Sequence, residues 1–292
     1  MPAIFVKVAR EEAGQKLVRF LERRVNGGVP RSAIMRWIRK GDVRVDKGRK
    51  KPFDIVKEGQ TVRIPPYRFS ADEKEADIQT LEHLDIIFEN DDILVVNKPG
   101  GLPVQGGSGH SDSVADRLKA MFSGKVFIPA PAHRLDRDTS GIVFCGKSHR
   151  GLKELSESFK NRNADKFYLA EVEGHWSKKG WTLMEDKMIK QGAPGKERMA
   201  TGAGKTALAE VKSVKSSDRS LLIIKLLTGR THQLRVQLAE RGFPIVGDMK
   251  YGLKSKQNCM RLHCFKVRIC GVEVSSLPLW IDSTDAELDL KV

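Results

Sequence analysis

A polar break that divides this chain into two unequal parts is the feature that most constrains its fold. Residues 68–84 are mostly polar and acidic, with large apolar side chains at only four of 17 positions. Such a stretch cannot form a core of its own, so it predicts a linker. Of the 292 residues 40% are hydrophobic, which is enough for one good core and a smaller one. We therefore expect two domains, residues 1–67 and residues 85–292.

Residues 1–67 have the pattern of two short helices and a pair of strands. Apolar side chains recur at intervals of three and four residues, as on the buried face of a helix, at Leu17, Phe20, Leu21 and Val25. We expect this helix to end at Gly27-Gly28. A second helix is predicted after Pro30, capped by Ser32 and closed by Gly41. Valine and isoleucine at 43–45 and 62–64 predict short strands.

The positive charge of the chain is concentrated at this N-terminal end. The net charge is +15, and residues 1–70 hold 18 Lys and Arg against 7 Asp and Glu, a net of +11 that leaves +4 for the rest of the chain. A basic cluster on a small domain indicates a polyanion, and nucleic acid is the expected partner. A DNA-reading helix-turn-helix would have a similar pattern.

The segment from Ser32 to Val45 resembles the S4 RNA-binding module. The resemblance implies that residues 1–67 form an S4-like domain that binds RNA. The side chains expected to contact the RNA are Arg31, Arg36, Arg39, Lys40 and Arg44.

After residue 85 the chain becomes rich in short apolar runs typical of strands. They lie at 93–96, 142–144, 168–172, 221–227 and 265–269, and one helix is expected at 152–159. Because strands and helices do not alternate strictly, we predict an α+β fold with a mixed, largely antiparallel sheet. Residues 184–206 are rich in Gly and Lys, and we expect them to form a mobile basic loop.

The densest polar cluster runs from His133 to Gly141, directly before an apolar strand. A polar cluster at the entrance to a strand is a candidate site, although a turn held by Asp and Thr side chains has the same composition. Asp136 and Asp138 would point the same way on an extended segment, so the carboxylate pair of a glycosidase is an alternative. A glycosidase would need an aromatic sugar-binding surface, and only 7% of the residues are aromatic.

This cluster resembles the signature of the RluA/RluC/RluD group of pseudouridine synthases. Further segments of the chain match that group in order: 97–101, 106–107, 166–168, 228–236, 242–248 and 261–263. With its S4-like module the chain is most similar to the RluC type. The resemblance implies a pseudouridine synthase catalytic domain that isomerises uridines in large-subunit (23S) ribosomal RNA. The same chemistry on tRNA, and a non-catalytic RNA-binding or ribosome-assembly protein, are the alternatives.

The resemblance also implies roles for individual residues. Asp136 would be the catalytic carboxylate, with Arg230 as its fixed cation. Tyr168 would lie against the uracil and take the C5 proton, while Arg134 would fill the gap that the extruded uridine leaves. The remaining residues expected at the substrate are His133, Lys166 and Leu262.

The reaction is an isomerisation without oxidation or group transfer, so no cofactor is expected. Cys259 and Cys264 flank His263 without a second ligand pair, so no metal is expected either. Gly204-Lys205-Thr206 imitates the end of a phosphate-binding loop, but Met199 occupies the position of its first glycine, and we expect no nucleotide cofactor. Without a signal peptide or a long apolar run, the protein is predicted to be cytoplasmic and not membrane-bound. The oligomeric state is left open.

Overall fold

The computed structural model describes residues 2–25, 28–67, 82–106, 112–193, 198–253 and 259–281. The N-terminal unit contains helices α1 (Leu17–Arg24) and α2 (Arg31–Lys40) and a 3-10 turn, η1 (Arg10–Glu12). Its three-stranded antiparallel sheet has the order β1-β3-β2, with β1 at Ile4–Lys7, β3 at Thr61–Ile64 and β2 at Arg44–Val45. The apolar residues that predicted the first helix, Leu17, Phe20, Leu21 and Val25, are all buried in the core of this unit.

Two details of this unit differ from the sequence prediction. Helix α2 begins at Arg31 with Pro30 as its N-cap, so Ser32 lies inside the first turn and does not cap it. The edge strand β1 was not anticipated, because Ile4 and Phe5 remain exposed and show no clear alternation of buried and exposed positions. Gly41 does end α2, in the left-handed conformation with φ 83° that glycine adopts without strain. Most of the expected linker, residues 68–81, lies outside the described residues. So does Gly27, the first residue of the expected end of the first helix.

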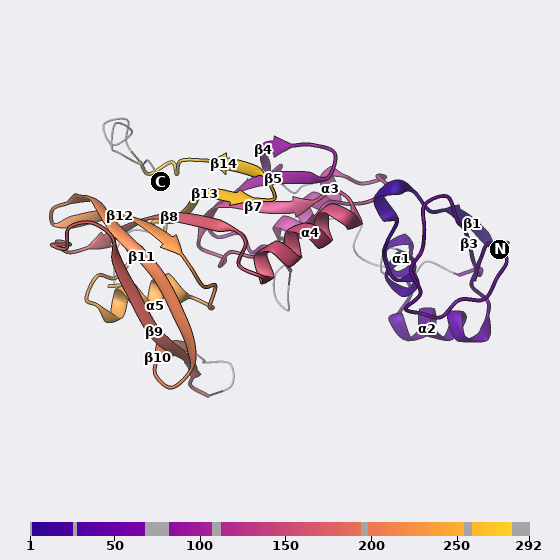
Figure 1. Ribbon diagram of the computed structural model, residues 1–292, viewed down its shortest axis with the longest axis horizontal. Coiled ribbons are helices and arrows are strands. Elements are labelled where there is room, and N and C mark those ends of the chain that lie inside the picture. The colour runs from indigo at the N-terminus through magenta and orange to yellow at the C-terminus, as the bar shows by residue number, and fades with distance from the viewer. Residues whose placement is uncertain are drawn as a thin grey trace.

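The second sheet has eleven strands, and its order confirms the predicted α+β class with a mixed, largely antiparallel sheet. Strands follow the order β10-β9-β11-β12-β8-β13-β7-β5-β4, with β14 beside β13 and β6 beside β7 (Figure 1). Only the β13–β7 pair is parallel among the described strands. The strand bounds are β4 Asp85–Glu89, β5 Ile93–Lys98, β6 Ala130–Pro131, β7 Ser140–Gly146, β8 Asp165–Glu173, β9 Thr182–Gln191, β10 Arg198–Thr201, β11 Lys205–Ser216, β12 Arg219–Leu226, β13 Leu262–Ile269 and β14 Val272–Ser275.

Within the described residues, three helices accompany this sheet. The expected helix is α4 (His149–Lys160), and two others were not expected, α3 (Val114–Met121) and α5 (Gln233–Glu240). Six of the eight residues of α5, Gln233 to Leu238, are buried, including the polar Gln233, Arg235 and Gln237. A helix buried all round has no polar face and therefore no amphipathic pattern to reveal it.

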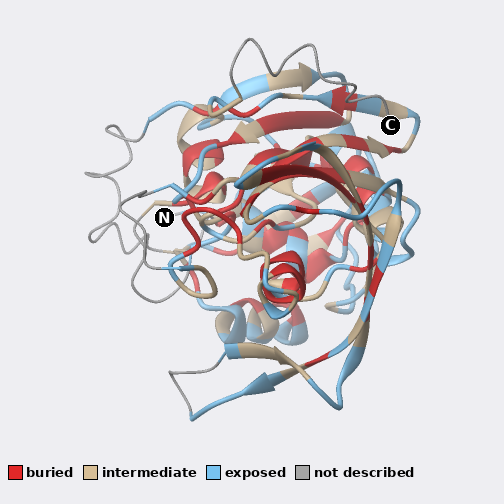
Figure 2. Cartoon of the chain, turned by 90° about the vertical axis from the view of Figure 1, so that its left-hand side faces the viewer, coloured by how far each residue is buried: buried red, intermediate tan, exposed pale blue. Residues whose placement is uncertain are grey.

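The prediction of a mobile loop at 184–206 is wrong for most of that segment. Strands β9 and β10 form an antiparallel ribbon that continues into β11. The physical reason is an alternation masked by lysines: Met184, Met188 and Ala207 are buried, while Lys187 and Lys190 on the same strands are exposed. Figure 2 shows this ribbon at the bottom, far more exposed than the central strands of the sheet.

The strand order brings distant parts of the sequence together. Strand β13 lies between β7 and β8, so His263 is level with Ser140 on one side and Cys264 is level with Tyr168 on the other. This approach depends on Gly141, where a Cβ atom would lie 2.3 Å from the carbonyl oxygen of Cys264. The loop that precedes β7 therefore lies next to the start of β13, which in turn pairs with β8.

The N-terminal unit lies at the opposite end of the molecule from β9–β12 (Figure 1). The guanidinium carbon of Arg23 lies 4.3 Å from the ring centre of Phe127, a contact between the two units. Within the described ranges, no helix has both the length and the apolar character needed to cross a membrane.

Candidate active site

Asp136 lies in the loop that leads into β7. Its neighbours Leu135 and Thr139 are buried, and the Thr139 amide donates a hydrogen bond to the Asp136 carbonyl oxygen at 3.2 Å. The Asp136 side chain is 22% exposed. The carboxylate is therefore partly exposed, while the buried neighbours and this hydrogen bond hold the backbone of its loop in place.

Lys98, at the end of β5, fixes the other side of this loop. Its side chain is fully buried, and its ammonium group donates to the carbonyl oxygens of Pro99, Leu102 and Arg137 at 2.8 to 2.9 Å. Burial lowers the pKa of Lys98 to about 7, although Asp138 and Asp136 act in the opposite direction. Because Arg137 follows Asp136 directly, Lys98 holds the backbone that carries the carboxylate.

Arg235, on α5, is the cation that the structure places beside Asp136. Its Nη1 lies 3.6 Å from Oδ2 of Asp136, and the guanidinium also binds Asp248 through two hydrogen bonds of 2.7 Å. Burial alone would raise the pKa of Asp248, but hydrogen bonds from Arg235 and from two backbone amides lower it below its usual value. Asp248 is thus an anion that holds Arg235 in one position.

The expectation that Arg230 partners Asp136 is not met. Arg230 precedes α5, and its Nε donates to the carbonyl oxygen of Thr206 on β11 at 3.0 Å. The segment 228–236 turns at His232 and continues as a helix, which carries Arg235 rather than Arg230 to the carboxylate. Arg230 still lines the same pocket.

His232 is a second nitrogen donor near Asp136, with Nε2 4.0 Å from Oδ2. The hydroxyl of Tyr251 lies 2.8 Å from Nδ1 of His232 and accepts a hydrogen bond from the Met199 amide at 3.1 Å. When the Tyr251 hydroxyl donates its hydrogen bond to Nδ1, the neutral imidazole carries its own proton on Nε2, the nitrogen nearer to Asp136. Burial lowers the pKa of His232, which favours this neutral form.

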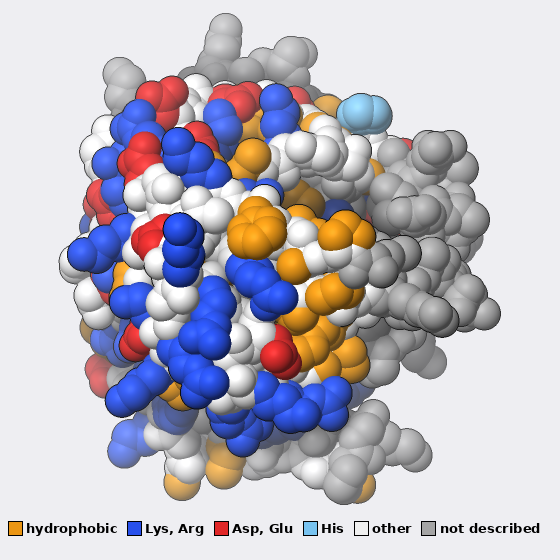
Figure 3. Space-filling view, turned by 90° about the vertical axis from the view of Figure 1, so that its right-hand side faces the viewer, with side chains coloured by type: hydrophobic (Ala, Val, Ile, Leu, Met, Phe, Trp, Pro, Cys, Tyr) orange, Lys and Arg blue, Asp and Glu red, His pale blue; other side chains and the backbone are white. Residues whose placement is uncertain are grey.

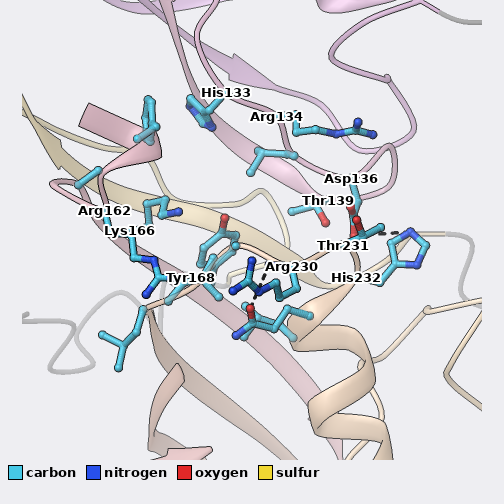
Figure 4. A pocket seen from close by; sticks show the side chains of 18 of the residues that line it. His133, Arg134, Asp136, Thr139, Arg162, Lys166, Tyr168, Arg230, Thr231 and His232 are labelled. Carbon is cyan, nitrogen blue, oxygen red and sulfur yellow. Dashed lines mark hydrogen bonds and ion pairs between the residues drawn. The ribbon is translucent and has the colours of Figure 1, made fainter. Parts of the chain in front are cut away.

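The pocket beside these residues has a volume of about 510 Å³. Figure 4 shows Asp136, Thr231 and His232 on one side, Lys166 and Arg162 on the other, and Tyr168 and Arg230 between them. All seven of the residues expected at the substrate or in catalysis line this pocket: His133, Arg134, Asp136, Lys166, Tyr168, Arg230 and Leu262.

Two of these side chains, the buried Tyr168 and the half-buried His133, have pKa shifts that limit their chemistry. Burial raises the pKa of Tyr168 well above its usual value, so this side chain is a neutral phenol. A neutral phenol can take the C5 proton only if it passes its own proton on. Burial lowers the pKa of His133 to about 3, and its Nε2 accepts the Phe144 amide at 3.0 Å. His133 is therefore a neutral acceptor that fixes β7.

A second histidine, the buried His263, supports the same strands. Nδ1 of His263 lies 2.8 Å from the Ser140 hydroxyl, and Nε2 lies 3.0 Å from the carbonyl oxygen of Ser276. Burial lowers the pKa of His263 to about 4. Across the described segments, no three His, Cys, Asp or Glu side chains come together as a metal-binding group.

The residues expected to bind RNA lie in the N-terminal unit and not around this pocket. Four of them are exposed on or at the ends of α2, and Arg44 is half-buried on β2. Arg31 pairs with Glu22, and Nε of Arg39 donates to the Met35 carbonyl oxygen at 3.3 Å. Figure 3 looks at this end of the molecule and shows Lys and Arg side chains gathered over much of the face.

Comparison with known proteins identifies the class of enzyme to which this site belongs. The family model described as RNA pseudouridylate synthase matches residues 92–240, which span Asp136, Tyr168, Arg230 and Arg235. The structure also resembles that of human RNA pseudouridylate synthase domain containing 1, with a TM-score of 0.61 and 27% sequence identity over 74% of this chain and 91% of the human one. The chain belongs to the RNA pseudouridylate synthase family and is an RNA pseudouridine synthase.

Its relatives include ribosomal large subunit pseudouridine synthase C of two bacteria. The Yersinia pestis protein is 36% identical and the Escherichia coli K12 protein 37% identical; in each case the match covers 85% of this chain and 79% of the relative. These similarities confirm the predicted resemblance to the RluA/RluC group.

Several functional residues were not singled out from the sequence. Arg235, Asp248 and Lys98 lie within the matched segments 228–236, 242–248 and 97–101, but nothing in the local pattern separates them from their neighbours. Tyr251 lies beyond those segments. What distinguishes them is their contacts, which arise only after folding: Arg235 pairs with Asp248, Lys98 binds three carbonyl oxygens, and Tyr251 binds His232.

Proposed function

We propose that this enzyme isomerises uridines of large-subunit ribosomal RNA, with Asp136 as the attacking carboxylate. The observation that carries the proposal is the convergence of Asp136, Tyr168 and Leu262 on one pocket, with Arg235 beside the carboxylate. Relatives named ribosomal large subunit pseudouridine synthase C support this choice of RNA. Such a substrate also supports a cytoplasmic location.

The reaction breaks the bond between C1′ and N1 of a uridine and forms a bond between C1′ and C5; C5 gives up its proton, and N1 gains one. Asp136 attacks the extruded nucleotide, and uracil turns within the pocket while it stays enclosed. The bond to Asp136 breaks again before the product leaves, so the carboxylate is regenerated. Arg235 keeps a positive charge next to the carboxylate when RNA displaces water from the site, which offsets the hydration that the carboxylate loses. Uridine and pseudouridine contain the same atoms, so the reaction needs no oxidant and no group donor.

The other pocket residues hold the substrate. Tyr168 lies against one side of the uracil, and Leu262 packs against the other side. Arg134 occupies the space that the extruded base leaves in the RNA. His133 and Lys166 complete the enclosure of the base. Arg230 keeps a substrate-binding role at the pocket wall, since its guanidinium is tied to Thr206 rather than to Asp136.

The N-terminal unit, residues 1–67, is proposed to be an S4-like RNA-binding domain joined by the linker at 68–84. Its exposed α2 residues would contact phosphates and recruit large RNA to the catalytic domain, residues 85–292. The concentration of basic side chains on the face in Figure 3 supports this proposal.

Mapping of pseudouridines tests the choice of RNA. Large-subunit ribosomal RNA and tRNA from a strain that lacks this protein are compared with RNA from the parent strain. Loss of specific pseudouridines from large-subunit RNA is expected. Loss from tRNA alone would replace the proposed substrate, and unchanged modification in both would point to an RNA-binding role.

A further inference from the structure

A second pocket opens beside Asp136, and the part of it lined by Arg198, Met249 and Lys250 has no role in the chemistry described above. Its volume is about 760 Å³. It shares Arg134, Asp136, Thr231, His232 and Arg235 with the first pocket and extends from them toward the β10 strand. Whatever occupies it must therefore lie next to the nucleotide in the first pocket.

The charge of this second pocket suits a phosphate. Five Arg and Lys side chains and two Asp side chains line it. Arg137 binds Asp138 at 2.8 Å, and Arg235 is held by Asp248 behind the wall. With Asp248 included, the wall and its support carry five positive and three negative charges, a net of +2.

The walls of the pocket are fixed before any ligand binds. Oδ1 of Asp248 accepts the backbone amides of Lys250 at 2.9 Å and Tyr251 at 3.0 Å, which holds the turn that carries Met249 and Lys250. The Met199 amide donates to the Tyr251 hydroxyl at 3.1 Å and so joins β10, with Arg198 at its start, to this turn. Arg198 and Lys250 thus reach one pocket from segments about fifty residues apart in the sequence.

Met249 gives the pocket an apolar edge. Its side chain is 76% exposed, although both neighbours in the sequence belong to the ordered turn. A thioether on a rigid turn at the rim of a basic pocket has the right properties to pack against a nucleotide base, which offers a polarisable face. Proteins hold single-stranded RNA by basic contacts to its backbone and by stacking of bases on aromatic or arginine side chains. In this pocket Met249 offers an apolar surface in place of an aromatic ring.

We infer that the second pocket binds the nucleotide adjoining the target uridine, with Arg198 and Lys250 at its phosphate and Met249 against its base. The inference rests on the proposed function, because it takes the first pocket as the place of the target uridine. Arg134 lines both pockets and stands between the two nucleotides. The second pocket then contributes to the choice of uridine, since the identity of the neighbouring base affects its contact with Met249.

The test uses a stem-loop RNA that contains the mapped uridine, with one neutral methylphosphonate in place of a single phosphate near the target. Binding to the full-length protein is measured by fluorescence anisotropy for each substituted RNA. With wild-type protein, one phosphate adjoining the target is expected to be sensitive, with affinity falling about three- to fivefold, as for an exposed charge pair. Arg198→Gln is expected to lose the same factor on unmodified RNA and to become insensitive at that phosphate.

The matched control is Lys179→Gln, which removes one charge from an exposed lysine between β8 and β9 that lines neither pocket. This variant should keep the wild-type sensitivity at every phosphate. Full sensitivity in Arg198→Gln at all positions, or no sensitive adjoining phosphate in wild-type protein, would overturn the inference.

The base contact is tested in the same way. Met249→Ala should weaken binding by about threefold, and an abasic site at the adjoining nucleotide should remove the difference between the variant and wild type. An equal loss on intact and abasic RNA would refute a contact with that base. If wild-type protein forms no pseudouridine in this RNA, the proposed function fails, while the affinity measurements still decide what the second pocket binds.

Discussion

Nη1 of Arg235 lies 3.6 Å from Oδ2 of Asp136, while the rest of its guanidinium is bound by Asp248. Arg235 is only 5% exposed, so its charge acts on the carboxylate through little intervening water. The arrangement makes Asp248 a positioning residue for the site, although it lies 112 residues further along the chain than Asp136.

Asp248→Asn should lower turnover more than RNA affinity. The amide cannot neutralise Arg235, whose buried charge then lacks its partner; removing one partner of a buried pair costs about 3 kcal/mol or more in the free energy of unfolding. Single-turnover rates should fall about 10- to 100-fold, as when a fixed electrostatic contact is lost from an active site. Urea unfolding and RNA titrations on the same variant separate the two effects.

Arg230→Lys is the matched comparison for Arg235→Lys. A lysine cannot bind Asp248 through two parallel hydrogen bonds and still approach Asp136, so Arg235→Lys should lose most of the turnover. Arg230→Lys should mainly affect RNA affinity. An equal loss of turnover in both variants would mean that Arg230 also acts on the carboxylate during the reaction.

His232 and Tyr251 should act as one unit on Asp136. Tyr251→Phe removes the hydroxyl that joins the Met199 amide to His232, and the loss of such a hydrogen bond costs about 1 kcal/mol in stability. His232→Asn is the suitable partner variant, because residue 232 has φ 53° and asparagine tolerates that conformation. Each variant should slow turnover severalfold, and the double variant should be no slower than the slower single one. Additive losses in the cycle would show that the two side chains act independently.

Two histidines, His133 and His263, should make the protein less stable in acid. Burial lowers the pKa of His133 to about 3 and of His263 to about 4, from 6.5. Between about pH 4 and 6.5 the unfolded chain takes up protons that the folded chain does not, so stability is lost as the pH falls through this window. Each such proton changes the free energy of unfolding by about 1.4 kcal/mol per pH unit.

His263→Gln keeps an acceptor for Ser140 and a donor for Ser276 but cannot take up a proton. Urea unfolding from pH 4.5 to 7 should show a smaller slope of stability against pH for this variant than for wild type. Identical slopes would mean that His263 takes up its proton in the folded protein as well.

The exposed face of α2 should set the salt dependence of RNA binding. Replacing Arg36, Arg39 and Lys40 together by Gln should reduce the slope of log K against log salt by about two units, because each phosphate contact contributes roughly 0.7 to 0.9. The control replaces three exposed lysines of the same unit, Lys50, Lys51 and Lys57, by Gln. An equal change of slope in both triple variants would show that the total charge of the unit matters and not the face of α2.

Much of this fold can be predicted from the sequence where one face of an element is buried. Helix α1 was found because its buried residues recur at helical spacing, and β5, β7, β8, β12 and β13 because they are buried nearly throughout. Helix α5 has no polar face, and the alternation of β9 is obscured by lysines. Neither element can therefore be predicted from the pattern of apolar residues: α5 has too few exposed polar positions, and β9 has too many lysines.

Some residues of the site could likewise be predicted from the sequence, and others could not. Asp136, Tyr168 and Leu262 could be predicted from matched segments, and the strand order β7-β13-β8 explains why these distant segments meet. The partner of Asp136 could not, since choosing between Arg230 and Arg235 depends on where the turn at His232 ends and α5 begins. The contacts of Lys98 with three carbonyl oxygens likewise exist only in the folded loop.

The most direct test of the account replaces Asp136 by Asn and follows a uridine-labelled large-subunit transcript. Wild-type protein should convert specific uridines to pseudouridine without releasing free uracil. Asp136→Asn should bind the same RNA with unchanged affinity and unfold at the same urea concentration, yet form no measurable pseudouridine, because the amide keeps the shape and removes the attacking oxygen anion. Asp138→Asn, which alters a carboxylate paired with Arg137, should remain active. Pseudouridine formation by Asp136→Asn at a rate near that of wild type would contradict the account.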